Sequence, residues 1–387
     1  MSGDAAPDDL LASYPNLRGL GPFSPEGEWG SIAVPSVPEA VARGVLQNGL
    51  TYFVQQNREP KSRAEFYLVV GFGSLVEEED EQGIAHIIEH LGFSATKQYE
   101  NHAIVKFLES IGAPFGACQN AYTSFDRTVY TLKVPTDKEG LMQETLTVLR
   151  EFAYFTRISE EDLEKERNVV LEEWRESRNA QGRLFEQYIT ELCKGSRWCE
   201  RFPIGKEHVI RNVPAQTLRN FYSRYYHPSR MAVIAVGDFD SGVVVETIKE
   251  LFDLAPESIS PLPRCATAPE RPEHEVPDSE GIAVAISTDR ELSFAQGMVD
   301  CKRPRRGLQT VLGFQKALTE ALFHKALSSR LLKLIVEPKG PRNVFMVSTE
   351  TGEPIPCLNP MSITLAPLPG RMRPALQTIV REIERVK

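Results

Sequence analysis

The chain has 387 residues, a length typical of two domains that each bury a hydrophobic core. Hydrophobic residues make up 41% and charged residues 25% of the sequence, a composition that is typical of folded globular proteins and excludes a disordered chain. The 53 acidic residues outnumber the 44 basic ones and give a net charge of −9, so we expect no nucleic-acid partner.

The sequence contains no recognisable targeting segment. No apolar run approaches the ~18–20 residues of a membrane span, and the acidic N-terminus lacks the basic character of a signal or transit peptide. We therefore expect a soluble protein without a membrane span, in the cytoplasm or in the lumen of an organelle. Residues 1–43, which are rich in proline, glycine and acidic side chains, are predicted to form a leader or surface segment.

Strand and helix patterns alternate between residues 44 and 260. A hairpin with an Asn48-Gly49 turn is predicted within 44–54, and further strands are predicted at 64–70, 126–134 and 231–236. Helical spacing of apolar residues predicts helices at 84–91, 102–111, 140–155, 159–178, 182–194, 215–225 and 243–252. The interleaving of strands and helices favours a layered α+β sandwich over a helix bundle or a barrel.

Residues 261–280 are rich in proline and have no hydrophobic period, which predicts a linker between a first domain, 44–260, and a second domain, 281–387. In the second domain, strands are predicted at 281–287, 294–299 and 343–349, and helices at 309–336 and 374–386. Because secondary structure continues to the last residues, we expect the second domain to be incomplete.

The most informative motif is His86-Ile-Ile-Glu89-His90. Two histidines four residues apart lie on one face of a helix, so both imidazoles can reach one metal ion, and Glu89 lies on the adjoining edge. Two histidines make two of the three protein ligands of a catalytic zinc, and a nearby carboxylate can accept a proton from water. The alternative is a surface pair of histidines with acidic neighbours.

A third ligand is expected on the acidic helix 159–178. Glu166 and Glu173 are seven residues apart and share one helix face, with the apolar Val169 and Val170 between them. A carboxylate on a buried face is either ion-paired or bound to metal, because burying it alone is costly. The pattern does not choose between these two roles. The remaining histidines lack paired spacing and are interpreted as surface or helix-packing residues: His102, His208, His227, His274 and His324.

Four blocks of the sequence, in the same order, resemble one family of zinc peptidases. The blocks are 73–90, which contains His86-Ile-Ile-Glu89-His90, then 119–130, 164–173 and 221–238. They look like the pitrilysin and insulin-degrading enzyme family, inverzincins with a His-x-x-Glu-His motif, which includes mitochondrial processing peptidase. The resemblance implies sandwich repeats in which a mixed, largely antiparallel sheet packs with helices, one repeat being complete and one truncated.

Carried over to this sequence, the resemblance implies roles for nine residues. His86, His90 and Glu173 would bind one zinc ion per chain, with Glu89 as the general base and Glu166 as a supporting carboxylate that orients the site. The strand edge on which the family binds the substrate backbone, by β-augmentation, is matched by Asn120, Ala121, Tyr122 and Thr123. Without the resemblance, Asn120 would be interpreted as a turn residue before a strand.

The implied function is that of a zinc-dependent metalloendopeptidase, which hydrolyses peptide bonds by metal-activated water with Glu89 as general base. The expected substrate is a peptide or a small unfolded protein. The Arg and Tyr that family members supply from a C-terminal half have no match in this chain, so a C-terminal half or a partner subunit would complete the chamber. The alternative is a catalytically incompetent fragment or scaffold that binds peptides.

Overall fold

The structure, a computed structural model, describes residues 40–255, 258–259, 270, 274–278, 281–305, 307–308, 310–336, 342–352 and 354–385. The chain divides into two compact units, an N-terminal unit, Glu39–Glu291, and a C-terminal unit that contains Leu292–Lys387. The expected leader lies outside the described residues up to residue 39, and the expected linker 261–280 lies outside them except for 270 and 274–278. None of the described helices is both long and apolar enough to cross a membrane.

A six-stranded mixed sheet forms the centre of the N-terminal unit. Its strands lie in the order β1-β2-β6-β3-β5-β4, and all neighbours are antiparallel except the parallel pair β2 and β6. The strands are β1 (Ala42–Val45), β2 (Thr51–Gln56), β3 (Arg63–Val70), β4 (Gln119–Thr123), β5 (Thr128–Pro135) and β6 (Met231–Gly237). The predicted mixed, largely antiparallel sheet is therefore confirmed.

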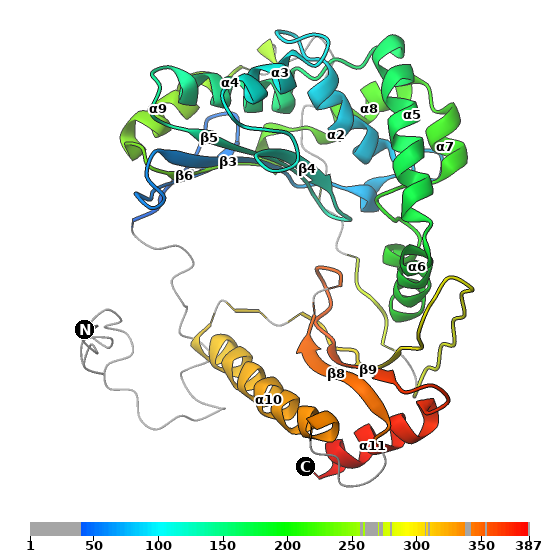
Figure 1. Cartoon of the computed structure of the whole chain (residues 1–387). Helices are drawn as coiled ribbons and strands as arrows, with labels where there is room; N and C mark the ends of the chain where they lie inside the picture. The colour runs from blue at the N-terminus through cyan, green and yellow to red at the C-terminus, as the bar shows by residue number, and fades with distance from the viewer. Residues whose placement is uncertain are drawn as a thin grey trace, which may run out of the picture. The chain divides into compact units, whose positions relative to one another are not determined.

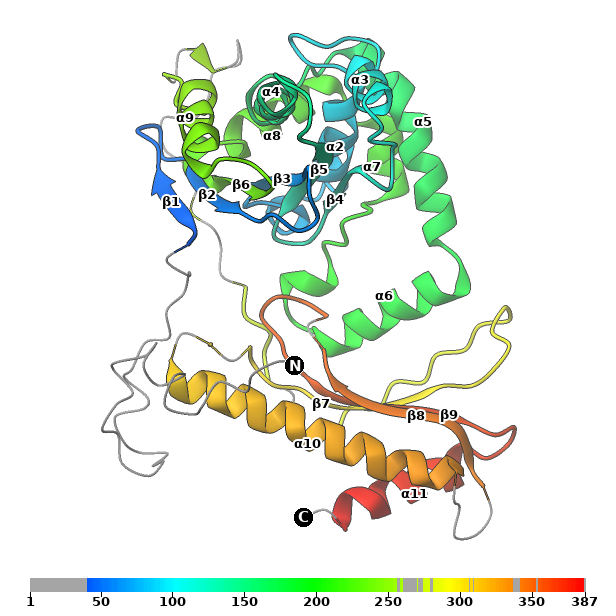
Figure 2. The same ribbon diagram turned by 60° about the vertical axis from the view of Figure 1, so that its left-hand side comes forward.

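Helices cover one face of this sheet (Figure 1). Alternate residues of β3 are buried, among them Phe66 and Leu68, because successive side chains of a strand point to opposite faces. The helices of this unit are α2 (Ile84–Ser94), α3 (Ala103–Ser110), α4 (Leu141–Tyr154), α5 (Glu160–Ser177), α6 (Ala180–Leu192), α7 (Glu207–Asn212), α8 (Ala215–Tyr225) and α9 (Ser241–Phe252). Of these, α6 extends away from the sheet (Figures 1 and 2). α4 packs on β3 and β5, and α9 packs on β2, so the sheet and its helices share one core.

Local sequence accounts for the two helices that form the site described below. α5 begins after Ser159, whose side chain accepts a 3.0 Å hydrogen bond from the backbone N–H of Asp162. α2 begins after Gly83, which has a φ of 104°, a conformation that favours glycine. The carboxylate of Glu77 accepts hydrogen bonds from the backbone N–H groups of Gly83, at 2.9 Å, and Ala85, at 2.8 Å. These bonds satisfy N–H groups that have no partner within the helix.

The C-terminal unit contains a three-stranded antiparallel sheet and two helices in its described part (Figure 2). The strands lie in the order β7-β9-β8, and buried Leu331, Leu365 and Ile379 are part of its core. The elements are β7 (Gly297–Cys301), α10 (Val311–Val336), β8 (Val344–Thr351), β9 (Met361–Pro367) and α11 (Met372–Glu384).

One predicted strand is wrong. Residues 281–287 form no strand, and their alternating apolar side chains are exposed, with Ile282 at 94% and Ile286 at 87% exposure. Alternation predicts a strand only where a neighbouring strand pairs with it, and no described strand pairs with this segment. The segment belongs to the N-terminal unit, where Arg183 of α6 binds Asp289 at 2.7 Å and Glu291 at 2.8 Å.

Candidate metal centre

α2 places two imidazoles side by side. His86 and His90 are one helical turn apart, and their Nε2 atoms are 3.3 Å from each other. The side chains are largely buried, with 15% and 17% exposure. Two ring nitrogens that face each other at this distance are arranged to share one proton or one metal ion.

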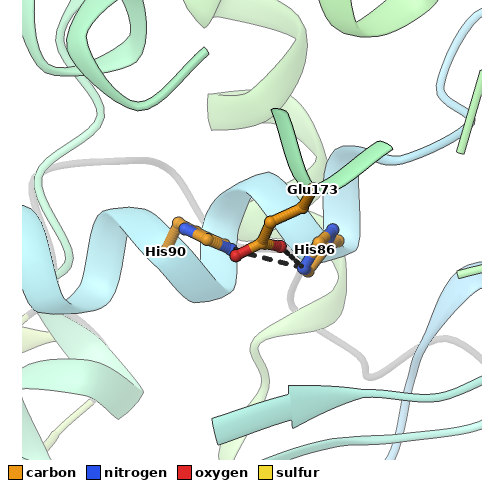
Figure 3. Close-up of side chains that lie close together, drawn as sticks. All are labelled: His86, His90 and Glu173. Carbon is orange, nitrogen blue, oxygen red and sulfur yellow. Dashed lines mark hydrogen bonds and ion pairs between the residues drawn. The ribbon is translucent and has the colours of Figure 1, made fainter. Parts of the chain in front are cut away.

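A carboxylate from a second helix completes the group. α5 packs against α2, and Glu173 Oε2 lies 3.3 Å from His86 Nε2 and 3.4 Å from His90 Nε2. Figure 3 shows the three side chains pointing toward one another. Among the described residues, these three form the one group of histidine, cysteine and carboxylate ligands close enough to hold a metal ion.

The three ligand atoms fit a zinc ion. The three distances between them are 3.3, 3.3 and 3.4 Å, which makes a nearly equilateral triangle. A tetrahedron with metal–ligand distances of about 2.05 Å has edges of about 3.3 Å. The donor set of two imidazole nitrogens and one carboxylate oxygen is also one that catalytic zinc sites use.

The charges of the three side chains are strongly coupled. Hydrogen bonding to His86 and His90 lowers the pKa of Glu173 far below its ordinary range. Burial lowers the pKa of His90, but the carboxylates of Glu166 and Glu173 outweigh it and raise the pKa to about 10. An anionic carboxylate therefore balances a positive charge at this position, whether that charge is a proton or a metal ion.

Glu89 lies beside the triangle. Its side chain is buried, and Oε2 accepts a 2.7 Å hydrogen bond from Thr123 Oγ1 on β4. Burial raises the pKa of Glu89, while His86, Thr123 and His90 oppose the increase. A carboxylate with a raised pKa is better suited to accept a proton than an ordinary surface glutamate.

Glu166 does not belong to the triangle but approaches His90 from the other ring nitrogen. Its Oε2 atom is 3.6 Å from His90 Nδ1, and its Oε1 atom is 3.8 Å from Nε2 of His102. The structure thus brings His102 to the site, although its isolated position in the sequence indicated no such role. The only signal in the sequence is the Asn101-His102 pair before a helix, because both residue types tolerate a left-handed backbone better than most.

Residues 120–123 lie on β4, the strand at the edge of the six-stranded sheet. Cys118 pairs with Lys133 and Ser124 with Arg127 through backbone hydrogen bonds, and such pairs alternate along an antiparallel ladder. The backbone groups of Ala121 and Thr123 therefore point away from β5, toward the open edge. Asn120 Oδ1 accepts a 2.9 Å hydrogen bond from the N–H of Ala121, so this outward donor has an internal partner.

A cavity of about 320 Å³ adjoins the same strand. Its lining includes Asn120, Ala121 and Tyr122 of β4 together with Lys133 of β5 and Tyr67 of β3. The open edge of β4 and a cavity for side chains thus occur together, as a site that binds an extended peptide requires.

Both parts of the chain match peptidase families. Residues 52–195 match the family described as "Insulinase (Peptidase family M16)", and residues 212–387 match the family described as "Peptidase M16 inactive domain". An Arabidopsis thaliana protein named "Zinc protease PQQL-like" is 46% identical over 292 residues, which cover 75% of this chain and 30% of that protein. "Probable zinc protease PqqL" of Haemophilus influenzae is 37% identical over 210 residues, 54% of this chain and 23% of that protein.

A solved structure shares the fold. The first half of the periplasmic protease PqqL from Escherichia coli is similar with a TM-score of 0.75 and 26% sequence identity, over 87% of this chain and 70% of that chain. The chain spans less than a third of the length of the two curated relatives that it matches.

Proposed function

Since the chain belongs to the insulinase family of peptidases, M16, we propose that it forms the zinc centre of a metalloendopeptidase. His86, His90 and Glu173 would hold one zinc ion per chain. The observation that carries the proposal is the triangle of ligand atoms with sides of 3.3 to 3.4 Å, which has the carboxylate of Glu89 beside it.

The residues around the triangle supply the acid–base chemistry. Zinc, when bound, acts as a Lewis acid that polarises a peptide carbonyl and makes water nucleophilic near neutral pH. Glu89 would accept the proton of the attacking water and pass it to the amine that leaves. Thr123 holds Glu89 Oε2 through a 2.7 Å hydrogen bond, so the base has a fixed orientation. Glu166 would orient His90 from its other ring nitrogen, which lies 3.6 Å away.

The substrate would be a peptide or a small unfolded protein that adds a strand to β4. The outward backbone groups of Ala121 and Thr123 would bind the substrate main chain, with the N–H of Ala121 exchanging its bond to Asn120 Oδ1 for one to the substrate. The cavity lined by Asn120 and Tyr122 would accept a side chain. A strand bound to this edge runs next to Thr123 and therefore next to Glu89. This arrangement would bring a scissile bond to the base.

The two family matches suggest a division of labour within the chain. We propose that residues 44–260 form the catalytic domain and that 281–387 form a non-catalytic repeat, although the second match already begins at residue 212 and 281–291 belong to the N-terminal unit. A soluble enzyme is consistent with this assignment. A C-terminal half or a partner subunit would complete the substrate chamber, because the matched relatives are much longer than this chain.

The proposal is tested by zinc content and peptide cleavage measured on the same preparations. The protein, purified without chelators, is expected to contain about one zinc per chain and to cleave an unfolded peptide. Glu89→Gln is expected to keep the zinc and to lose about 10²- to 10⁴-fold in cleavage rate.

Three outcomes separate the alternatives. Protein without zinc, or Glu89→Gln with the wild-type cleavage rate, would contradict the proposal. Protein that binds zinc and peptide but cleaves only when a C-terminal half is added would identify this chain as the peptide-binding, zinc-loaded half of the enzyme.

A further inference from the structure

The carboxylate of Glu166 connects two imidazoles. Only 8% of its side chain is exposed, and its two oxygens face different histidines: Oε2 faces His90 Nδ1 at 3.6 Å and Oε1 faces His102 Nε2 at 3.8 Å. A buried carboxylate needs partners for both oxygens, and each imidazole offers a ring N–H group. His102, Glu166 and His90 therefore form a continuous polar chain that ends at the metal centre.

The backbone around His102 has an unusual conformation. Asn101 and His102 have φ values of 52° and 56°, and neither is glycine. Consecutive left-handed residues of this kind are rare in ordinary loops and are concentrated at functional sites. The bend directly precedes α3, for which His102 is the N-cap residue.

The bend is attached to the helix that bears both histidine ligands. The backbone N–H of His102 donates a 2.9 Å hydrogen bond to the carbonyl of Ser94, the last residue of α2. The carbonyl of His102 in turn accepts a 3.1 Å bond from Lys106 N–H in α3. His102 is thus fixed relative to His86 and His90 through the backbone and reaches Glu166 on α5 through its side chain.

The two proposed histidine ligands differ in the surroundings of their Nδ1 atoms. Nδ1 of His86 is buried and has no hydrogen-bond partner among the described residues, whereas Nδ1 of His90 faces Glu166. Any orienting effect of the polar chain therefore acts on His90 alone. A partner on Nδ1 holds the proton there and leaves Nε2 available as a ligand.

We propose that His102 is a positioning residue of the metal centre, which acts through Glu166 to fix the ring of His90. The inference rests on the proposed zinc site. Nε2 of His102 lies 3.8 Å from Oε1 of Glu166, and this contact would keep the carboxylate turned toward His90 Nδ1. Half of the His102 side chain is exposed, so an ion pair between His102 and Glu166 would add little energy. The proposed role of His102 is therefore to orient the carboxylate of Glu166.

The decisive variant is His102→Asn. Asparagine also tolerates the left-handed backbone, so the bend is kept, but its side chain is too short to reach Glu166. His102→Gln is the second variant, because its longer amide can donate a hydrogen bond to the carboxylate. His208→Asn on α7 is the matched control for the loss of a histidine away from the site.

The measurement is the zinc affinity of each folded variant, determined by competition with a chelator at one fixed pH, with urea unfolding as a check of the fold. His102→Asn is expected to weaken zinc binding about 10- to 100-fold, the effect of removing a residue that orients a ligand. His102→Gln should bind zinc more tightly than His102→Asn, and His208→Asn should match the wild type. In the double variant His102→Asn/Glu166→Gln, zinc should bind no more weakly than in Glu166→Gln alone, because His102 acts through Glu166.

Two results would overturn the inference while leaving the zinc site intact. One is a wild-type zinc affinity in His102→Asn. The other is a double variant whose loss of zinc affinity is the product of the losses in His102→Asn and Glu166→Gln. The absence of zinc from the wild-type protein would instead contradict the proposed function itself.

Discussion

The hydroxyl of Thr123 donates a hydrogen bond to Glu89 Oε2 at 2.7 Å and thereby joins the edge strand β4 to α2, the helix that bears Glu89. Thr123→Val removes the hydroxyl with little change in shape, whereas Thr123→Ser keeps it. We expect Thr123→Val to lower kcat about 10-fold, the effect of one hydrogen bond of ~1.4 kcal/mol, and to leave KM nearly unchanged. Steady-state kinetics of both variants tests this; an equal loss of kcat in the two would show that the hydroxyl is not responsible.

Glu173 and its neighbour Glu172 form a matched pair on α5. The side chain of Glu172 is 64% exposed and is paired with Arg175, whereas Glu173 Oε2 contacts both histidines. Glu173→Gln is expected to weaken zinc binding more than about 100-fold, beyond the effect of removing an orienting residue, and Glu172→Gln is expected to have no effect. Zinc retention during dialysis against a chelator measures the difference. Equal retention by the two variants would remove Glu173 from the ligand set.

The open edge of β4 predicts that proline has different effects at two adjacent positions of this strand. Ala121→Pro removes an outward N–H group together with its 2.9 Å bond to Asn120 Oδ1, but no bond of the ladder, whereas Tyr122→Pro removes a ladder bond to Val129. We therefore expect Ala121→Pro to raise KM for peptides about 2- to 10-fold and to keep the fold, and Tyr122→Pro to lower the free energy of unfolding. Peptide kinetics and urea unfolding measure the two effects. Wild-type KM in folded Ala121→Pro would argue against strand addition at this residue.

Glu77, which binds the first turn of α2, predicts a dependence of stability on pH. Burial raises its pKa from the ordinary 4.5 to about 8, although the N–H groups of Ala85 and Gly83 oppose this. Between about pH 5 and about pH 8 the folded protein retains a proton that the unfolded chain releases, so the free energy of unfolding decreases as the pH rises through this range. The decrease is at most about 1.4 kcal/mol per pH unit.

This contribution is isolated by comparison with Glu77→Gln, which cannot titrate. Urea unfolding at about pH 5.5 and about pH 7.5 should show a steeper loss of stability in the wild type than in the variant. Identical slopes in the two proteins would indicate that Glu77 is ionised throughout this range.

The parts of the site that could be predicted from sequence are local. The spacing within five consecutive residues was enough to predict that His86 and His90 share one face of α2 and that Glu89 lies beside them. Helical spacing left Glu173 and Glu166 as two candidates on one face. The family resemblance implied that Glu173 is the ligand, and the packing of α5 against α2 places its Oε2 atom against both histidines. His102 depended on a left-handed bend and on a partner from another helix, and neither is encoded in a periodic pattern.

In the fold as well, the elements that follow from a local pattern were predicted, and those that depend on a distant partner were not. The predicted helix 84–91 and strand 64–70 correspond closely to α2 and β3, because each has a clear apolar period. The segment 281–287 has an equally clear alternation, yet it forms no strand, since pairing depends on a neighbour that no local pattern specifies. The strand β9 was not predicted, although it is the central strand of its sheet.

The position of β6 between β2 and β3 determines when the site can form and how the protein can be divided. A fragment that ends at residue 195, like the insulinase-family match, would contain all three proposed ligands and Glu89. It would nevertheless leave the facing edges of β2 and β3 unpaired, as rows of backbone groups that readily pair with other chains. On the ribosome, a nascent chain that ends before residues 231–237 would likewise contain the proposed ligands without a central strand of the sheet behind them.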